Sequence, residues 1–100
     1  EILADAQQDL LNQNHALFME QMNGLTQYQI RFVRAIMDGK AHEINRKDTI
    51  EEYELGSSAN IATIKKALQK KELVEIEGKE IHFSDSIFIH WLRRNTHLLT

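Results

Sequence analysis

The chain has 100 residues, of which 42% are hydrophobic and 27% charged, with a formal net charge of −3. This composition is typical of one globular domain with a modest core. No segment approaches the roughly 18 consecutive apolar residues of a transmembrane helix. The chain lacks cysteine, which excludes disulfides and thiolate metal sites and fits a cytoplasmic protein. It begins at Glu1 without a signal-like segment, and we expect it to be a piece of a longer protein.

Charge is distributed unevenly along the chain. Residues 1–25 contain four acidic residues and no lysine or arginine, whereas residues 26–100 contain all 12 basic residues against 11 acidic ones. Neither part has the strong positive balance of a dedicated nucleic-acid binder.

One long helix is predicted over residues 2–22, which contain no glycine or proline. Apolar side chains recur every seven residues in two neighbouring rows and form a broad stripe. The rows are Leu3, Leu10 and Leu17, and Leu11, Phe18 and Leu25. This stripe would pack on the rest of the chain or on a missing domain. Alternatively, residues 3–25 would form the seam of a homodimer.

Three shorter helices follow, each with a start or stop signal. Thr26 is placed to cap a helix over Thr26–Gly39, and Asp48 to cap a second over Asp48–Leu55. Gly56 breaks the second, and Ser57 or Ser58 then caps a third over Ser58–Lys71.

A β-hairpin is predicted after the third helix, because the apolar period changes at Glu72 from helical spacing to alternation. Gly78 and Lys79 suit a two-residue turn with φ > 0 at the first position. Such a turn places Ile76 opposite Ile81, and Val74 opposite Phe83, on one side of the ribbon.

A last helix follows the hairpin, with Ser84 or Asp85 as its cap and Phe88 and Trp91 on its apolar face. The fold class is therefore mainly α with a small β-hairpin: a winged helix with an extra N-terminal helix and a C-terminal helix. We divide the chain into residues 1–24, a helix leading from a missing upstream domain, and residues 25–100, the winged-helix domain. The predicted core residues are Val33, Ile36, Ile50, Leu55, Ile61, Ile64, Leu68, Leu73, Val74, Ile76, Ile81, Phe83, Phe88 and Trp91.

No residue pattern predicts catalysis or metal binding. The histidines His15, His42, His82, His90 and His97 have no carboxylate at a spacing that would complete a metal site. A serine–histidine–acid triple can be chosen from Ser57, His82 and Asp85, but no strained nucleophile turn or oxyanion hole accompanies it. We expect no enzyme activity and no cofactor in these residues.

The outward face of the Ser58–Lys71 helix is the candidate surface for DNA or a protein partner. In DNA-binding winged helices this helix enters the major groove, and the wing touches phosphate or the minor groove. The candidate contact residues are Ser58, Ala59, Ala62, Thr63, Lys66, Lys70 and Lys79. Glutamates on the wing and on the preceding helix disfavour DNA, because acidic groups repel phosphates.

The chain also resembles the C-terminal winged-helix region of archaeal-type ATPases, which are AAA-like P-loop proteins. The matching segments are Leu25-Thr26, Gln29, the apolar run to Ile36 before Gly39, Tyr53–Asn60, Lys65–Leu68, Lys71–Val74, Asp85–Phe88 and Trp91-Leu92. The resemblance covers residues 25–94. It departs at Ser86, where the family usually has proline, a residue that is favoured but not required at the first helical position.

The resemblance implies that the full-length parent binds ATP and Mg²⁺ through a domain upstream of Glu1. We therefore expect a non-catalytic module that regulates the ATPase or docks on its upstream domain or on a protein partner. The alternative is a DNA-binding module that uses the Ser58–Lys71 helix.

Overall fold

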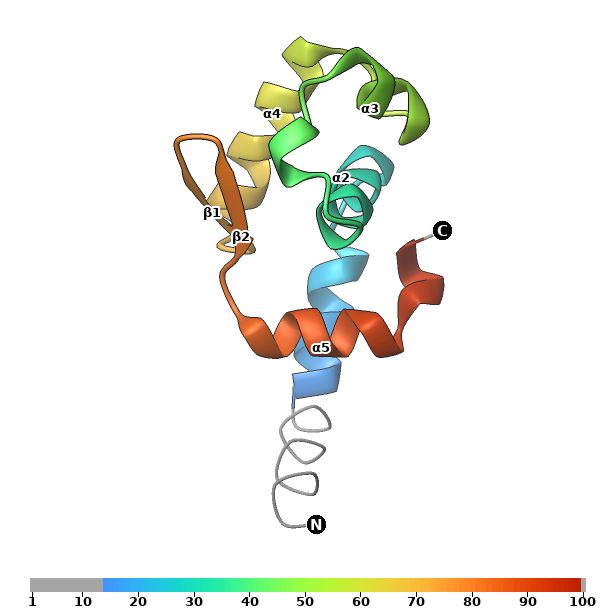
Figure 1. Ribbon diagram of the computed structural model, residues 1–100. Helices are drawn as coiled ribbons and strands as arrows, with labels where there is room; N and C mark the ends of the chain where they lie inside the picture. The colour runs from blue at the N-terminus through green and yellow to red at the C-terminus, as the bar shows by residue number, and fades with distance from the viewer. Residues whose placement is uncertain (1–13, 100) are drawn as a thin grey trace.

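The computed structural model describes residues 14–99 (Figure 1). Helix α1 includes residues 14–23. The elements that follow are α2 (Gln27–Met37), the 3₁₀ helix η1 (Ala41–Glu43), α3 (Lys47–Glu52), α4 (Ser58–Lys70), β1 (Val74–Glu77), β2 (Glu80–Phe83), α5 (Ser86–Arg94) and the 3₁₀ helix η2 (Thr96–Leu99).

The predicted winged-helix fold is confirmed. Helices α2, α3 and α4 form the helical body, β1 packs along α4, and the β1–β2 hairpin forms the wing. Helix α5 runs across α1 on the side away from α3, and η2 then returns toward α2 (Figure 1).

Side-chain caps start three of the helices as predicted, and the fourth prediction is wrong. Thr26 and Gln29 form a reciprocal capping box at α2, Ser57 caps α4, and Asp85 caps α5. Asp48 does not cap α3, because the N-cap position belongs to Arg46, which makes no side-chain cap. The Asp48 carboxylate instead lies in the first turn, where it contacts the Arg46 guanidinium at 3.3 Å.

Helices α3 and α4 are each followed, directly after the C-cap residue, by a glutamate in the left-handed conformation. Glu54 has φ 54° and Glu72 has φ 61°. After each of them the chain closes a six-residue turn, in which the Leu55 N–H donates to Ile50 O and the Leu73 N–H to Leu68 O. Helix α3 therefore ends at Glu52, earlier than the predicted Leu55, and Gly56 (φ 91°) acts only after the helix has stopped.

The predicted strand register of the wing is confirmed. Val74 pairs with Phe83 and Ile76 with Ile81, and Gly78 has φ 61° in the turn. These apolar pairs share the inner face of the ribbon, so Glu75, Glu77 and Glu80 lie on the outer face.

Most predicted core residues are buried, but Ile36, Ile50, Ile76 and Phe83 are only half-buried. These four still pack against the core, and three of them line hollows at the surface. Further buried residues complete the core: Phe18, Met22, Leu25, Phe32, Ala35, Ile44, Leu92 and Leu99.

Among the described residues of the predicted α1 stripe, only those of one row enter the core. Phe18 is 2% exposed and Leu25 9%, whereas Leu17 in the other row is 51% exposed. Leu3, Leu10 and Leu11 lie outside the described residues. Phe18 and Met22 of α1 belong to the same hydrophobic core as the winged-helix residues. The division of the chain into residues 1–24 and 25–100 stays a prediction.

Replacing Leu68 by alanine should lower the free energy of unfolding by about 2–5 kcal/mol, because the side chain is fully buried in α4 and its removal leaves a cavity. Urea unfolding followed by Trp91 fluorescence measures this change. Leu17→Ala is the matched control: its side chain is 51% exposed, so we expect a loss below about 0.5 kcal/mol. Equal losses in the two variants would contradict the packing described above.

Replacing Glu72 by glycine should stabilise the domain by about 1 kcal/mol, because glycine adopts positive φ without the steric cost that other residues incur. Glu72 is exposed and takes part in no ion pair among the described residues, so little else is lost. Thermal unfolding measures the change. Glu75→Gly, in the middle of β1, should instead be destabilising, and stabilisation of both variants would argue against the backbone explanation.

Candidate partner-binding surface

The exposed face of α4 brings together most of the predicted contact residues. Burial of Ile61, Ile64 and Leu68 fixes the rotation of the helix, so the opposite face points to solvent. The solvent-facing residues are Ser58, Ala59, Ala62, Thr63, Lys66 and Lys70, and all are exposed.

The chemistry of this face changes along α4. Its first half is small and neutral, since it presents alanine side chains and the hydroxyls of Ser58 and Thr63. The Thr63 hydroxyl donates to Ala59 O at 3.3 Å, so its proton is engaged by its own helix. The second half carries Lys66 and Lys70, which take part in no ion pair within the described range. We refer to these six residues as the α4 face.

Two other basic residues do not extend the α4 face. Lys71 donates from Nζ to Gly24 O at 3.1 Å and so ties the end of α4 to the α1–α2 turn. Lys79, the remaining predicted contact residue, lies at the tip of the wing between Glu77 and Glu80. Its charge is therefore outweighed by those of its immediate neighbours.

The outer face of the wing is acidic. Glu77 lies directly opposite Glu80, and Glu75 directly opposite His82. Among the described residues, Glu80 is the one of the three whose carboxylate contacts a basic side chain, with Oε2 3.3 Å from His82 Nε2. Like charges in directly opposed positions destabilise a hairpin slightly, and these three carboxylates would also repel a phosphate backbone.

The segment that precedes α4 in the chain is acidic as well. Glu51, Glu52 and Glu54 are exposed on α3 and on the turn that leads to α4. Of the three, only Glu54 has an ion-pair partner within residues 14–99, with its carboxylate 3.8 Å from Arg31. Acidic groups thus lie on α3 and on the wing, the elements that precede and follow α4 in the chain.

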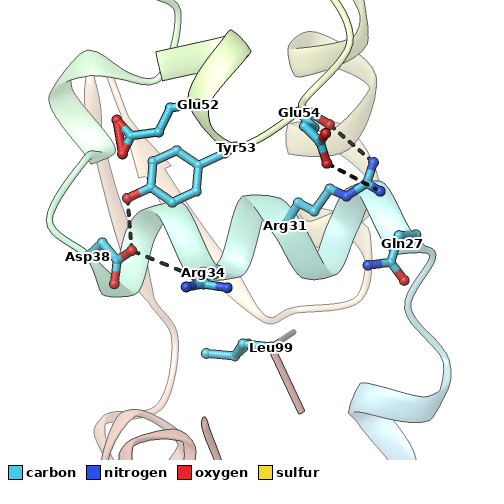
Figure 2. Close-up of a pocket in the computed structure, with 8 residues that line it drawn as sticks. All are labelled: Gln27, Arg31, Arg34, Asp38, Glu52, Tyr53, Glu54 and Leu99. Carbon is cyan, nitrogen blue, oxygen red and sulfur yellow. Dashed lines mark hydrogen bonds and ion pairs between the residues drawn. The ribbon is translucent and has the colours of Figure 1, made fainter. Parts of the chain in front are cut away.

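A polar cleft of about 450 Å³ lies between α2 and the end of α3 (Figure 2). Arg31 pairs with Glu54, and the Arg34 guanidinium lies 4.0 Å from the Asp38 carboxylate. The Tyr53 hydroxyl donates to Asp38 at 2.8 Å. Because its charged groups largely neutralise one another, the cleft joins α2 to α3 and is a poor site for a charged ligand. The sequence gives only a weak signal for it, the spacing of two arginines one turn apart on α2.

The histidines and acids show no catalytic or metal-binding arrangement within residues 14–99. Here no group of three or more His, Asp or Glu residues is placed to hold a metal ion. Ser57 caps α4, His82 contacts Glu80, and Asp85 caps α5, so each member of the serine–histidine–acid triple has another structural role.

Tyr53 should titrate late. Burial, together with the hydrogen bond to the Asp38 carboxylate, raises the pKa of Tyr53 from 10.0 to about 12. The neutral phenol is thus favoured in the folded state. Its contribution to stability is fully present below pH 10.0 and is lost as the pH rises toward about 12. Absorbance titration of the phenolate should show this late step, which should be absent in Tyr53→Phe. If the variant keeps the late step, Tyr53 is not the group that titrates there.

Comparison with known proteins identifies the domain type. Residues 16–94 match the family model described as a probable winged helix domain. No curated protein sequence and no solved structure shows significant similarity to the chain. In the part of the chain that the structure describes, no helix is long and apolar enough to cross a membrane.

Proposed function

The chain belongs to the probable winged helix domain family, and we propose that it is a non-catalytic docking module that binds a protein partner through the α4 face. The charge pattern around α4 supports this proposal. Carboxylates lie on the outer face of the wing and on α3, the elements that follow and precede a helix whose leading half is neutral and small. A protein surface can complement this pattern with its own basic groups at the rim, whereas DNA would bring phosphates toward these carboxylates.

We propose that the partner is the nucleotide-binding domain of a P-loop ATPase that carries this chain at its C-terminal end. The resemblance of residues 25–94 to the winged-helix region of archaeal-type ATPases supports this assignment. ATP and Mg²⁺ would bind entirely upstream, and the winged helix would act by docking. Sequencing the coding region upstream of Glu1 tests the assignment. A strand–GxxxxGK[ST]–helix pattern there would support it, and an upstream region without one would contradict it.

DNA binding is the second candidate function. The observation in its favour is the accessibility of the α4 face, where Lys66 and Lys70 could contact phosphates and the alanines permit close approach. Winged helices serve both DNA and protein contacts, so the fold does not decide between the two.

A titration of the chain against labelled generic duplex DNA, followed by fluorescence anisotropy at low and moderate salt, separates the two functions. We expect no binding at protein concentrations up to about 100 μM, the weak end of ordinary non-specific binding. Binding that falls steeply with salt and is lost in Lys66→Glu/Lys70→Glu would overturn the docking proposal. Lys47→Glu is the matched control, because Lys47 is an exposed residue of α3 and its charge reversal leaves the α4 face unchanged.

Reversing the charge of the wing tests the electrostatic argument itself. Glu75→Lys/Glu77→Lys removes two carboxylates from the outer face without changing the inner, apolar face. If these carboxylates keep DNA away, the variant should acquire salt-sensitive DNA binding in the same assay. A variant that stays inert would show that the shape of the α4 face, rather than its charged surroundings, excludes DNA.

A further inference from the structure

A groove runs between the C-terminal part of α2 and the C-terminal segment formed by α5 and η2. It consists of two adjoining hollows of about 320 and 500 Å³, which share Met37 and Arg93 as lining residues. We refer to it as the α2–α5 groove. It lies on elements that do not contribute to the α4 face, so it is a second surface.

The wall nearest the wing is mostly apolar, with His82 and the shared Arg93 as its polar residues. Its half-buried lining residues are Ile36 and Met37 from α2, Phe83 from β2 and Ile89 from α5. Ile87 packs against the buried core. Ile89, two residues later on α5, lines the groove and does not pack against that core. An isoleucine in this position gains little from the fold of its own chain and could be covered by another segment.

The far end of the groove is basic. Arg34 and Arg93 line it together with His97, and Asp38 is the acidic residue among its lining. The Asp38 carboxylate is already engaged by the Tyr53 hydroxyl and lies 4.0 Å from Arg34. Arg93 is exposed and forms no ion pair within residues 14–99. A segment with apolar side chains along one face and carboxylates at its edge would therefore complement the groove.

The first 13 residues of the chain have this chemistry. They contain Glu1, Asp5 and Asp9 and no lysine or arginine, and they also contain Ile2, Leu3, Leu10 and Leu11. On the helix predicted for this segment, Leu3 and Leu10 share one face, and Asp5 and Asp9 lie one turn apart on another. Such amphipathic helices are the usual occupants of apolar grooves.

From these observations we propose that the α2–α5 groove binds residues 1–13 of a second copy of the chain. The predicted helix over residues 2–22 has no glycine or proline at which the segment could turn back into its own groove. Reciprocal exchange between two copies fills both grooves and gives a closed two-fold dimer. Each acidic segment then lies beside Arg93 of the other copy.

Sedimentation velocity of the full chain, from about 1 μM to about 1 mM, tests the proposal over the range in which weak interfaces dissociate. The wild type should dimerise reversibly. Arg93→Glu should weaken dimerisation at least tenfold, and so should Asp5→Lys/Asp9→Lys. Combining the two sets of changes should restore most of the loss, because each reversed charge then meets its opposite. Lys47→Glu, on α3, should have no effect.

Three results would overturn the proposal. The first is a wild type that stays monomeric throughout the concentration range. The second is a dimer that is insensitive to both charge reversals, since it must then use another surface, such as the one around exposed Leu17. The third is a combined variant that dimerises no more strongly than the variants with one set of changes, because the two groups of charges would then not be in contact. Thermal unfolding of each variant confirms that a lost dimer is not a lost fold.

Discussion

The rest of the structure depends on the contact between Phe18 and the aromatic side chains of α5. The ring of Phe18 lies edge-on to Phe88, with 5.1 Å between centroids, and 5.4 Å from Trp91. Phe83 extends this cluster into the wing, 5.8 Å from Phe88. Each such pair contributes about 0.5–1.5 kcal/mol beyond the area it buries. One cluster therefore holds together α1, the wing and α5. The positions of β2 and α5 in turn determine the shape of the α2–α5 groove, which both elements line.

Local patterns in the sequence were sufficient to predict the caps of α2, α4 and α5, the hairpin register and the inward face of α4, because each depends on residues a few positions apart. The end of α3 could not be predicted in this way, since a glutamate occupies a conformation that glycine usually adopts. The sequence also could not show that Phe18 is buried and Leu17 exposed, because this depends on the packing of α1 against α5, which lies far along the chain. The α4 face followed from helical spacing alone, but the polar cleft and the α2–α5 groove require the tertiary arrangement.

The two surfaces of the domain have different chemistry, which bears on what each can recognise. The α4 face is a convex ridge, small and neutral at its start and basic at its end, and the wing that follows it carries carboxylates. The α2–α5 groove is concave, apolar near the wing and basic at its far end. A ridge suits a partner with a matching depression, whereas a groove suits a single extended or helical segment. The two proposals therefore concern separate surfaces.

The attachment of α1 also determines how movement passes through the molecule. Phe18 and Met22 are buried, the Trp91 indole N–H donates to His15 Nδ1 at 2.9 Å, and Lys71 holds the carbonyl of Gly24. These contacts clamp α1 to α5 and to the end of α4, so the helix does not hinge freely on the body of the domain. A domain joined rigidly to the N-terminal end of α1 would therefore move α1 and the α4 face together as one rigid body.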